Sequence, residues 1–189
     1  MKKTLISLFL VAVMLFLMVG CSPTNLEDRH VTDPAQYGRV PSFIDFPDFF
    51  PESITDYTVN SYAYTNMSFF DVSYEVFLDI TVDETQLDAL LKKARAYYQN
   101  YDEREAYNAK GYKEIVFGDS FMLDKEDGQS VSSACIAKVV YNPETGNMIY
   151  EYLLAVDPYE VKDVAYFNKF GIGAAEYEAE LKARDNTKE

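Results

Sequence analysis

The sequence has few of the residues from which most catalytic and metal-binding centres are built. It contains one His, two Cys and no Trp in 189 residues. Zinc sites and disulfide-dense scaffolds need several Cys or His at short spacings, so we expect neither. A Ser or Cys nucleophile normally needs a His base. His30 stands in a stretch interrupted by Pro and Gly, and Cys135 stands in a predicted strand. We therefore predict no catalytic and no metal-binding residue, and we interpret Cys135 as a buried structural cysteine.

Basic residues are scarce as well. Lys and Arg number 17 against 31 Asp and Glu, which gives a formal net charge of −14. Nucleic-acid binding needs a basic surface, so we expect no nucleic-acid partner. Two short motifs also fail as ligand sites. Gly171-Ile172-Gly173 does not follow a strand as nucleotide-binding loops do, and Asp124–Gly128 has Lys125 and, further on, Ala134 where a calcium loop needs oxygen ligands. The sequence thus predicts no cofactor.

One long apolar run is present, at the amino terminus. Residues 5–19 contain a single polar residue and no charge, and they follow Lys2 and Lys3. A basic start, an apolar run and a small residue before the cleavage point are typical of a secretory signal peptide. The run is shorter than the roughly 20 residues that a membrane-spanning helix needs. We therefore predict a cleaved signal rather than a spanning helix.

The end of this run has a recognisable pattern. Leu17-Met18-Val19-Gly20-Cys21 resembles the lipobox of bacterial lipoproteins, with Met18 where Leu is usual. The resemblance implies removal of residues 1–20, diacylglycerol on the Cys21 sulfur, and acylation or retention of the new amino terminus. Two or three acyl chains hold a protein firmly on a bilayer. We expect a protein anchored to the cell membrane through Cys21, on its extracytoplasmic face.

The mature chain divides into a tether and a domain. Residues 21–42 contain several Pro, few apolar residues and no periodicity, so we predict a flexible tether. Residues 43–189 are predicted to form a single domain. Its first segment, 43–54, contains four Phe interrupted by Pro47 and Pro51. Because four exposed Phe would make a large apolar patch, we expect this segment to pack on the domain rather than to serve as an exposed docking motif.

Alternation of apolar and polar residues predicts the strands. They are expected over residues 57–65, 70–82, 112–117, 131–141 and 147–156, with a further short strand possible at 121–123. In the strand 70–82, Ser73, Glu75 and Asp79 fall on the face opposite Val76 and Leu78, with Phe77 as an exception. This pattern predicts an antiparallel sheet with one face open to solvent.

A long helix is predicted after residue 82. Asp83 and Gln86 form a capping-box pair. An apolar stripe follows at helical spacing and is continued by Tyr97, Tyr98 and Tyr101, so the helix should end between residues 100 and 111. Residues 142–146 predict a hairpin turn, and short helices are expected near 161–166 and 174–184. The fold predicted is α+β: a single antiparallel sheet of five to six strands in the order β-β-α-β-β-β, one long amphipathic helix on one face and short carboxyl-terminal helices.

A second resemblance concerns residues 43–95. The stretch FDVSYEVFLDITVDETQLDALLKKAR resembles a pattern in small uncharacterised lipoproteins of Gram-positive gut bacteria. It implies a related fold and a surface location, and it implies no activity.

The remaining notable feature is tyrosine, which occurs 16 times. Tyr62 and Tyr64 share a strand face, as do Tyr150 and Tyr152, and these pairs suit either sheet packing or a sugar- or peptide-binding platform. The absence of Trp weakens the case for sugar. We expect a non-enzymatic binding module at the cell envelope, with a protein or glycan partner. The alternatives are a small hydrolase that uses paired carboxylates, and an inhibitor or accessory subunit that acts through a loop or sheet edge.

Overall fold

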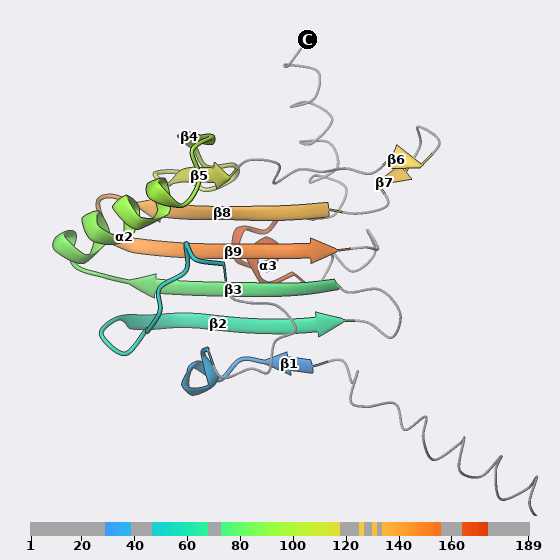
Figure 1. Ribbon diagram of the computed structural model, residues 1–189, viewed down its shortest axis with the longest axis horizontal. Coiled ribbons are helices and arrows are strands. Elements are labelled where there is room, and N and C mark those ends of the chain that lie inside the picture. The colour runs from blue at the N-terminus through green and yellow to red at the C-terminus, as the bar shows by residue number, and fades with distance from the viewer. Residues whose placement is uncertain are drawn as a thin grey trace, which may run out of the picture.

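Seven antiparallel strands form the central sheet, in the order β1-β2-β3-β9-β8-β5-β4 (Figure 1). The computed structural model describes residues 29–38, 47–67, 73–117, 125–126, 130–131, 134–155 and 164–173. One long helix follows the third strand and a short helix comes after the ninth, so the α+β class is confirmed.

The strands of the main sheet are β1 (Arg29–Val31), β2 (Thr58–Met67), β3 (Ser73–Thr81), β4 (Tyr101–Glu105), β5 (Lys113–Phe117), β8 (Ala134–Asn142) and β9 (Asn147–Ala155). A separate two-stranded sheet consists of β6 (Lys125–Glu126) and β7 (Ser130–Val131). The helices are η1 (Pro34–Gln36), α2 (Glu84–Tyr97) and α3 (Ala165–Phe170). No described helix has the length and apolar character needed to cross a membrane.

Both edge strands differ from the sequence predictions. β1 and η1 fall within residues 21–42, the range predicted as a tether, and there they are part of the folded domain. β4 occupies residues that the helical stripe had included, because α2 ends at Tyr97 and Tyr98 is already extended. The consecutive aromatic residues at this point favour extended backbone over helix. The sheet therefore has seven strands rather than five or six.

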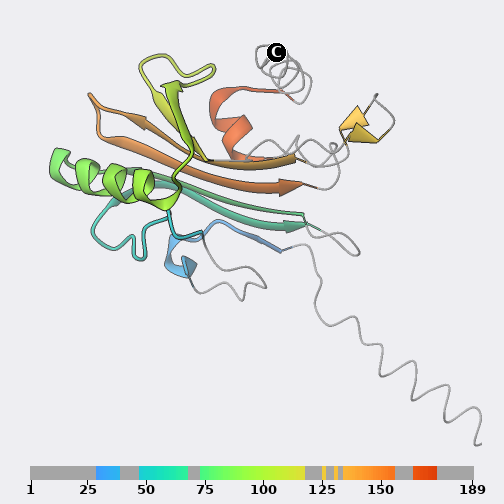
Figure 2. The same cartoon turned by 45° about the horizontal axis from the view of Figure 1, so that its top comes forward.

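The helix α2 covers one face of the sheet (Figure 2). Its predicted capping box is confirmed, since the Asp83 carboxylate accepts from the Gln86 backbone N–H and the Gln86 side chain accepts from the Asp83 backbone N–H. Its buried side chains are Leu87, Leu90, Leu91 and Ala94. They belong to an apolar cluster that also contains Val76, Leu78 and Ile80 of β3.

Residues 47–57 lie on the same side as α2 (Figure 2). Phe49 and Phe50 are 0% and 2% exposed. The ring of Phe49 packs 4.6 Å from that of Phe117, and the ring of Phe50 packs 5.3 Å from that of Tyr150, measured between centroids. For these two rings the prediction of packing on the domain is confirmed. Phe43 and Phe46 lie outside the described residues.

The turn between β8 and β9 requires glycine. Gly146 has a φ of +69°, and a Cβ at this position would lie 2.1 Å from the carbonyl oxygen of Val82. The Val82 backbone N–H donates to the Gly146 carbonyl oxygen over 3.0 Å. The predicted hairpin turn is therefore confirmed, and it also joins the end of β3 to the β8–β9 hairpin.

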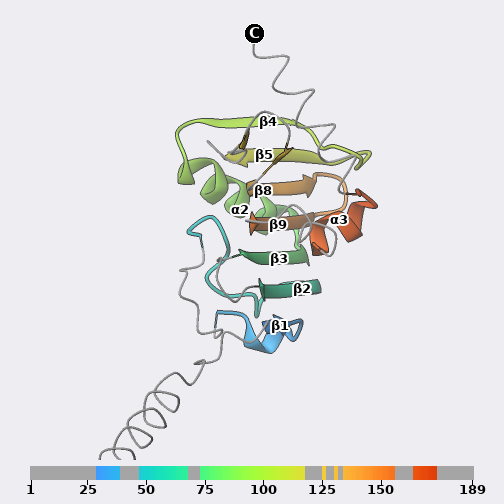
Figure 3. The same ribbon diagram turned by 90° about the vertical axis from the view of Figure 1, so that its right-hand side faces the viewer.

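The second face of the sheet is covered by α3, so the expectation of a solvent-open face is wrong (Figure 3). Ser73, Glu75 and Asp79 point to the predicted side of β3, yet each is at most 1% exposed. The second apolar cluster explains this burial. It joins α3 and its flanks to the sheet and includes Phe77, Ile136, Val140, Ile149, Leu153, Val164, Tyr166, Phe167 and Ile172. The helix predicted at 174–184 and the strand at 121–123 lie outside the described residues.

Candidate functional site

Four acidic side chains are buried on the face that α3 covers. We call Glu75, Asp79, Glu114 and Glu151 the buried carboxylates, and each is 0% or 1% exposed. They come from three strands, β3, β5 and β9. Buried carboxylates need hydrogen bonds or cations to offset the loss of hydration. The four differ in how far that need is met.

Both carboxylate oxygens of Asp79 have hydrogen-bond or ion-pair partners. Its Oδ1 accepts from the side-chain amides of Asn60 and Asn147 over 2.9 and 2.6 Å. Its Oδ2 lies 2.7 Å from Nζ of Lys169, which belongs to α3. This ion pair ties the short helix to the centre of the sheet.

Glu114 lies between two cations. Its Oε1 accepts from Nε of Arg104 over 2.7 Å, and its Oε2 lies 3.5 Å from Nζ of Lys138. Arg104 also contacts Asp102 at 2.9 Å on β4. Lys138 is 5% exposed, and its Nζ lies 3.9 Å from the centroid of the Tyr166 ring. The charges of β4, β5 and β8 are thus paired with one another, and of these residues Lys138 lies against the Tyr166 ring of α3.

Glu75 takes the place of a helix cap. The residue before α3, Val164, has no side chain that could accept from the first turn. Instead Oε1 of Glu75 accepts from the Tyr166 backbone N–H over 3.3 Å. Burial raises the pKa of Glu75 from 4.5 to about 7, although hydrogen bonds from the backbone of Tyr166 and Ala165 act in the opposite direction.

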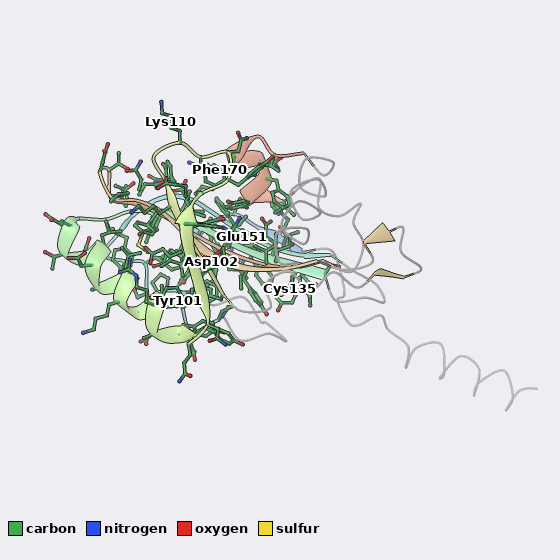
Figure 4. The ribbon with its side chains drawn as sticks, turned by 90° about the horizontal axis from the view of Figure 1, so that it is seen from above. Tyr101, Asp102, Lys110, Cys135, Glu151 and Phe170 are labelled. Carbon is green, nitrogen blue, oxygen red and sulfur yellow. The ribbon has the colours of Figure 1, made fainter. Side chains whose placement is uncertain are left out.

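Glu151 is the least compensated of the four. It is 0% exposed, and within the part of the chain that the structure describes neither carboxylate oxygen accepts a hydrogen bond. In register it lies opposite Phe77 on one side and Lys138 on the other. Burial raises its pKa well above the usual value, the charge of Glu75 adds to this rise, and Lys138 opposes it. In Figure 4 Glu151 lies among the strands on the side where α3 carries Phe170.

His30 is not in a tether but on β1, paired with Thr65 of β2. Its Nδ1 lies 2.9 Å from the Thr65 hydroxyl oxygen, and the side chain of His30 is exposed. A hydroxyl and an imidazole at this distance resemble the first two members of a catalytic triad. The third member is missing among the described residues, where no carboxylate is bonded to the ring. Three strands separate β1 from β8, so His30 does not reach Cys135.

The tyrosines named from the sequence divide into core and surface. Tyr62, Tyr64 and Tyr150 are 3%, 3% and 0% exposed, so the platform interpretation is wrong for them and the packing interpretation holds. Cys135 is half-buried, and burial raises its pKa. Cys21 lies outside the described residues.

Three tyrosines at the junction of α2 and β4 are instead exposed. We call Tyr97, Tyr98 and Tyr101 the tyrosine surface, and they are 40%, 41% and 39% exposed. The ring of Tyr97 packs against the buried ring of Phe49, with their centroids 5.1 Å apart. A bidentate ion pair lies next to this surface and joins α2 to β4, from Arg95 to Glu103 at 3.1 and 2.9 Å. The Tyr141 hydroxyl donates to the same Glu103 carboxylate. The tyrosine surface is thus bordered by a bidentate ion pair and packs on the buried ring of Phe49.

The buried carboxylates were not identified from the sequence as a site. The signal that could have identified them is that apolar residues flank the acidic ones in the sequence, as in SYEVFLD and IYEYLLA. Within the described ranges no group of three or more His, Cys, Asp or Glu side chains has the arrangement of a metal site.

Comparison of this chain with protein-family models, with curated proteins and with solved structures found no match.

Proposed function

We propose that this chain is a lipoprotein held at the extracytoplasmic face of the cell membrane through acyl chains on Cys21, and that its domain is a non-enzymatic binding module for a protein of the cell envelope. The observation that carries the binding role is the tyrosine surface. The anchor rests on the sequence pattern that ends at Cys21.

The order of the sheet supports outward presentation of the tyrosine surface. β1 begins at Arg29, eight residues after Cys21, and β4 forms the opposite edge of the sheet. A strand spacing of about 4.8 Å puts the two edges about 29 Å apart. An anchor on the β1 side leaves the β4 edge and the tyrosine surface far from the point of attachment.

The chemistry of this edge favours a protein over a glycan. Tyr is enriched at protein interfaces because it combines a large apolar ring with a hydroxyl. Among the described residues β4 pairs with β5 alone, so its other side presents backbone N–H and C=O groups to which an extended segment can add. The chain has no Trp, the side chain most suited to stacking on sugars.

A carboxylate-based hydrolase is less well supported. Glu75 and Glu151 have the raised pKa values that a general acid needs. A substrate must still touch them, and they are 1% and 0% exposed beneath α3. We therefore assign these groups a role inside the domain.

Site-specific photo-crosslinking tests the binding role. In the full chain, in the cells that naturally carry it, Tyr98 is replaced by a photoreactive phenylalanine derivative, and the matched control replaces Asn168, which is exposed on α3. We expect one discrete protein adduct from position 98 and none from position 168. No adduct at 98, or the same adducts at both positions, contradicts the proposal.

The anchor is tested separately. Intact-mass spectrometry of the membrane fraction should give a wild-type mass increased by the lipid on Cys21, and Cys21→Ala should leave the membrane fraction. An unacylated wild type, or a processed Cys21→Ala protein that stays membrane-bound, contradicts the anchor and leaves the crosslinking result standing.

A further inference from the structure

The charges on the α3-covered face do not balance pair by pair. Asp79 is matched by Lys169, and Glu114 is matched by Arg104 and Lys138. Glu75 and Glu151 make no ion pair among the described residues. Among the described residues, four buried carboxylates therefore face three cations, and Arg104 is also shared with the exposed Asp102, so these cations do not match every buried carboxylate when all are ionised.

The two carboxylates without an ion pair in the described ranges, Glu75 and Glu151, are neighbours in the sheet. Glu75 pairs in register with Leu153, and Glu151 stands two residues before Leu153 on the same face of β9. The two glutamates are therefore diagonal neighbours, a relation in which residues are typically about 7–8 Å apart and their Cβ atoms somewhat closer. Two carboxylates so close in an apolar environment resist simultaneous ionisation. Phe77, Ile149, Tyr166 and Phe167, all at most 1% exposed, keep water from this region.

The amino-terminal end of α3 rests on one member of this pair. Glu75 accepts from the Tyr166 backbone N–H, and α3 has only six residues and no side-chain cap of its own. So short a helix is not stable alone and depends on its contacts with the sheet. The protonation state of the pair therefore changes the contact between Glu75 and the first turn of α3.

We propose that a proton bound by the Glu75–Glu151 pair holds α3 on the sheet, so that α3 loosens as the medium turns from acidic to alkaline. With the proton present, the pair carries at most one negative charge and Glu75 can still accept from α3 through an unprotonated oxygen. Without it, two adjacent buried carboxylates repel each other beneath the helix. The ion pair between Lys169 and Asp79 is then the main polar contact that still holds α3 on the sheet.

One other ionisable side chain lies on this side of the sheet. His30 of β1 lies 2.9 Å from the Thr65 hydroxyl, and Thr65 pairs in register with Glu75. It is exposed and two strands away from Glu75. Water screens an exposed charge at that distance far more than a buried one, so we assign the dependence to the buried pair.

Hydrogen exchange of the full chain, in detergent, tests the proposal. Amides 165–172 are followed by mass spectrometry from pH 5 to 8, with labelling times scaled to the intrinsic exchange rate and with β9 as internal reference. We expect wild-type protection of α3 to fall by about tenfold per pH unit once the pair titrates. Glu151→Gln should make this fall shallower, because no second carboxylate then repels Glu75, although burial still raises the pKa of Glu75. His30→Gln is the control and should follow the wild type.

A second variant guards against a folding failure. Glu75→Gln keeps a carbonyl oxygen for the Tyr166 N–H and should flatten the profile as well. A wild-type α3 whose protection does not change between pH 6 and 8 overturns the proposal. So does a Glu151→Gln profile identical to that of the wild type, or a profile that flattens in His30→Gln.

Discussion

Each face of the sheet is covered by a helix, and different chemistry holds the two helices in place. The face under α2 is apolar, and its helix carries its own capping box and four buried side chains. The face under α3 contains four buried carboxylates, and its helix has six residues and borrows a cap from the sheet. Apolar contacts do not depend on pH, whereas buried charges do. The comparison implies a pH-insensitive scaffold on one side and a pH-responsive layer on the other.

The largest effect is expected on the α2 face. Phe49→Ala should cost about 3–5 kcal/mol of unfolding free energy, because a fully buried ring is lost and the site cannot collapse fully. Phe49 contacts the rings of Phe50, Tyr97, Phe117 and Tyr150. Urea denaturation measures the loss. Tyr98→Ala, at a position 41% exposed, is the control and should change stability by no more than about 0.5 kcal/mol. A Phe49→Ala loss below about 1 kcal/mol would show that residues 47–57 contribute little to the core.

A charged position on the α3 face comes next. Lys138→Met keeps the aliphatic length but removes the cation that faces Glu114 and Glu151. Breaking a buried ion pair from one side costs about 3 kcal/mol, because the remaining charge stays buried. Adding Glu151→Gln should recover part of the loss, since fewer unmatched charges then remain. Urea denaturation of the single and double variants at pH 7 gives both values, and additive losses would contradict the coupling.

The pH dependence of stability separates the faces without a core substitution. The folded pKa of Glu75 is about 7 against 4.5 in a model peptide, so the folded protein binds this proton more tightly than the unfolded chain. Its contribution is full below pH 4.5 and is lost as the pH rises to about 7, by about 3 kcal/mol in total. Glu103 acts with the opposite sign, because its hydrogen bond from Arg95 lowers its pKa, but it is partly exposed and screened.

Urea denaturation at pH 5, 6, 7 and 8 measures this dependence. The wild type should lose stability as the pH rises, and Glu75→Gln should lose about 2.5 kcal/mol less between pH 5 and 8. Relief of repulsion within so acidic a chain also favours the folded state at low pH, and it does so in both proteins. Equal slopes for the two proteins would therefore assign the dependence to net charge and not to Glu75.

The same comparison explains how far sequence reasoning reached. Periodicity identified β2, β3, β8, β9 and α2, because each of them is long enough for a pattern to repeat, and the apolar run Ile115–Phe117 identified the five-residue β5. It missed β1, which has three residues, and β4, whose five residues are mostly exposed and charged. In β3 it placed Glu75 and Asp79 on the correct side but left that side open to solvent. Alternation reports which way a side chain points and is silent on what covers it.

The site was beyond sequence reasoning for the same reason. The buried carboxylates come from three strands and meet a helix about 90 residues further along the chain than β3. Their isolation depends on α3, whose six residues have no strong periodicity. The tyrosine surface was obscured differently. Tyr97, Tyr98 and Tyr101 continued the helical stripe and were assigned to the buried face, but α2 ends at Tyr97 and leaves all three partly exposed.

The smallest effect sharpens the comparison of the two helices. Asp83→Ala removes the acceptor for the Gln86 backbone N–H and should cost about 1 kcal/mol, independent of pH between 6 and 8. The four buried side chains of α2 should keep the helix docked, so its amides should stay protected in hydrogen exchange apart from the first turn. Asp88→Ala, exposed on the same helix, is the control and should show no loss. Undocking of all of α2 in Asp83→Ala would contradict this, because it would mean that the cap and not the apolar face holds α2, as we propose for Glu75 and α3.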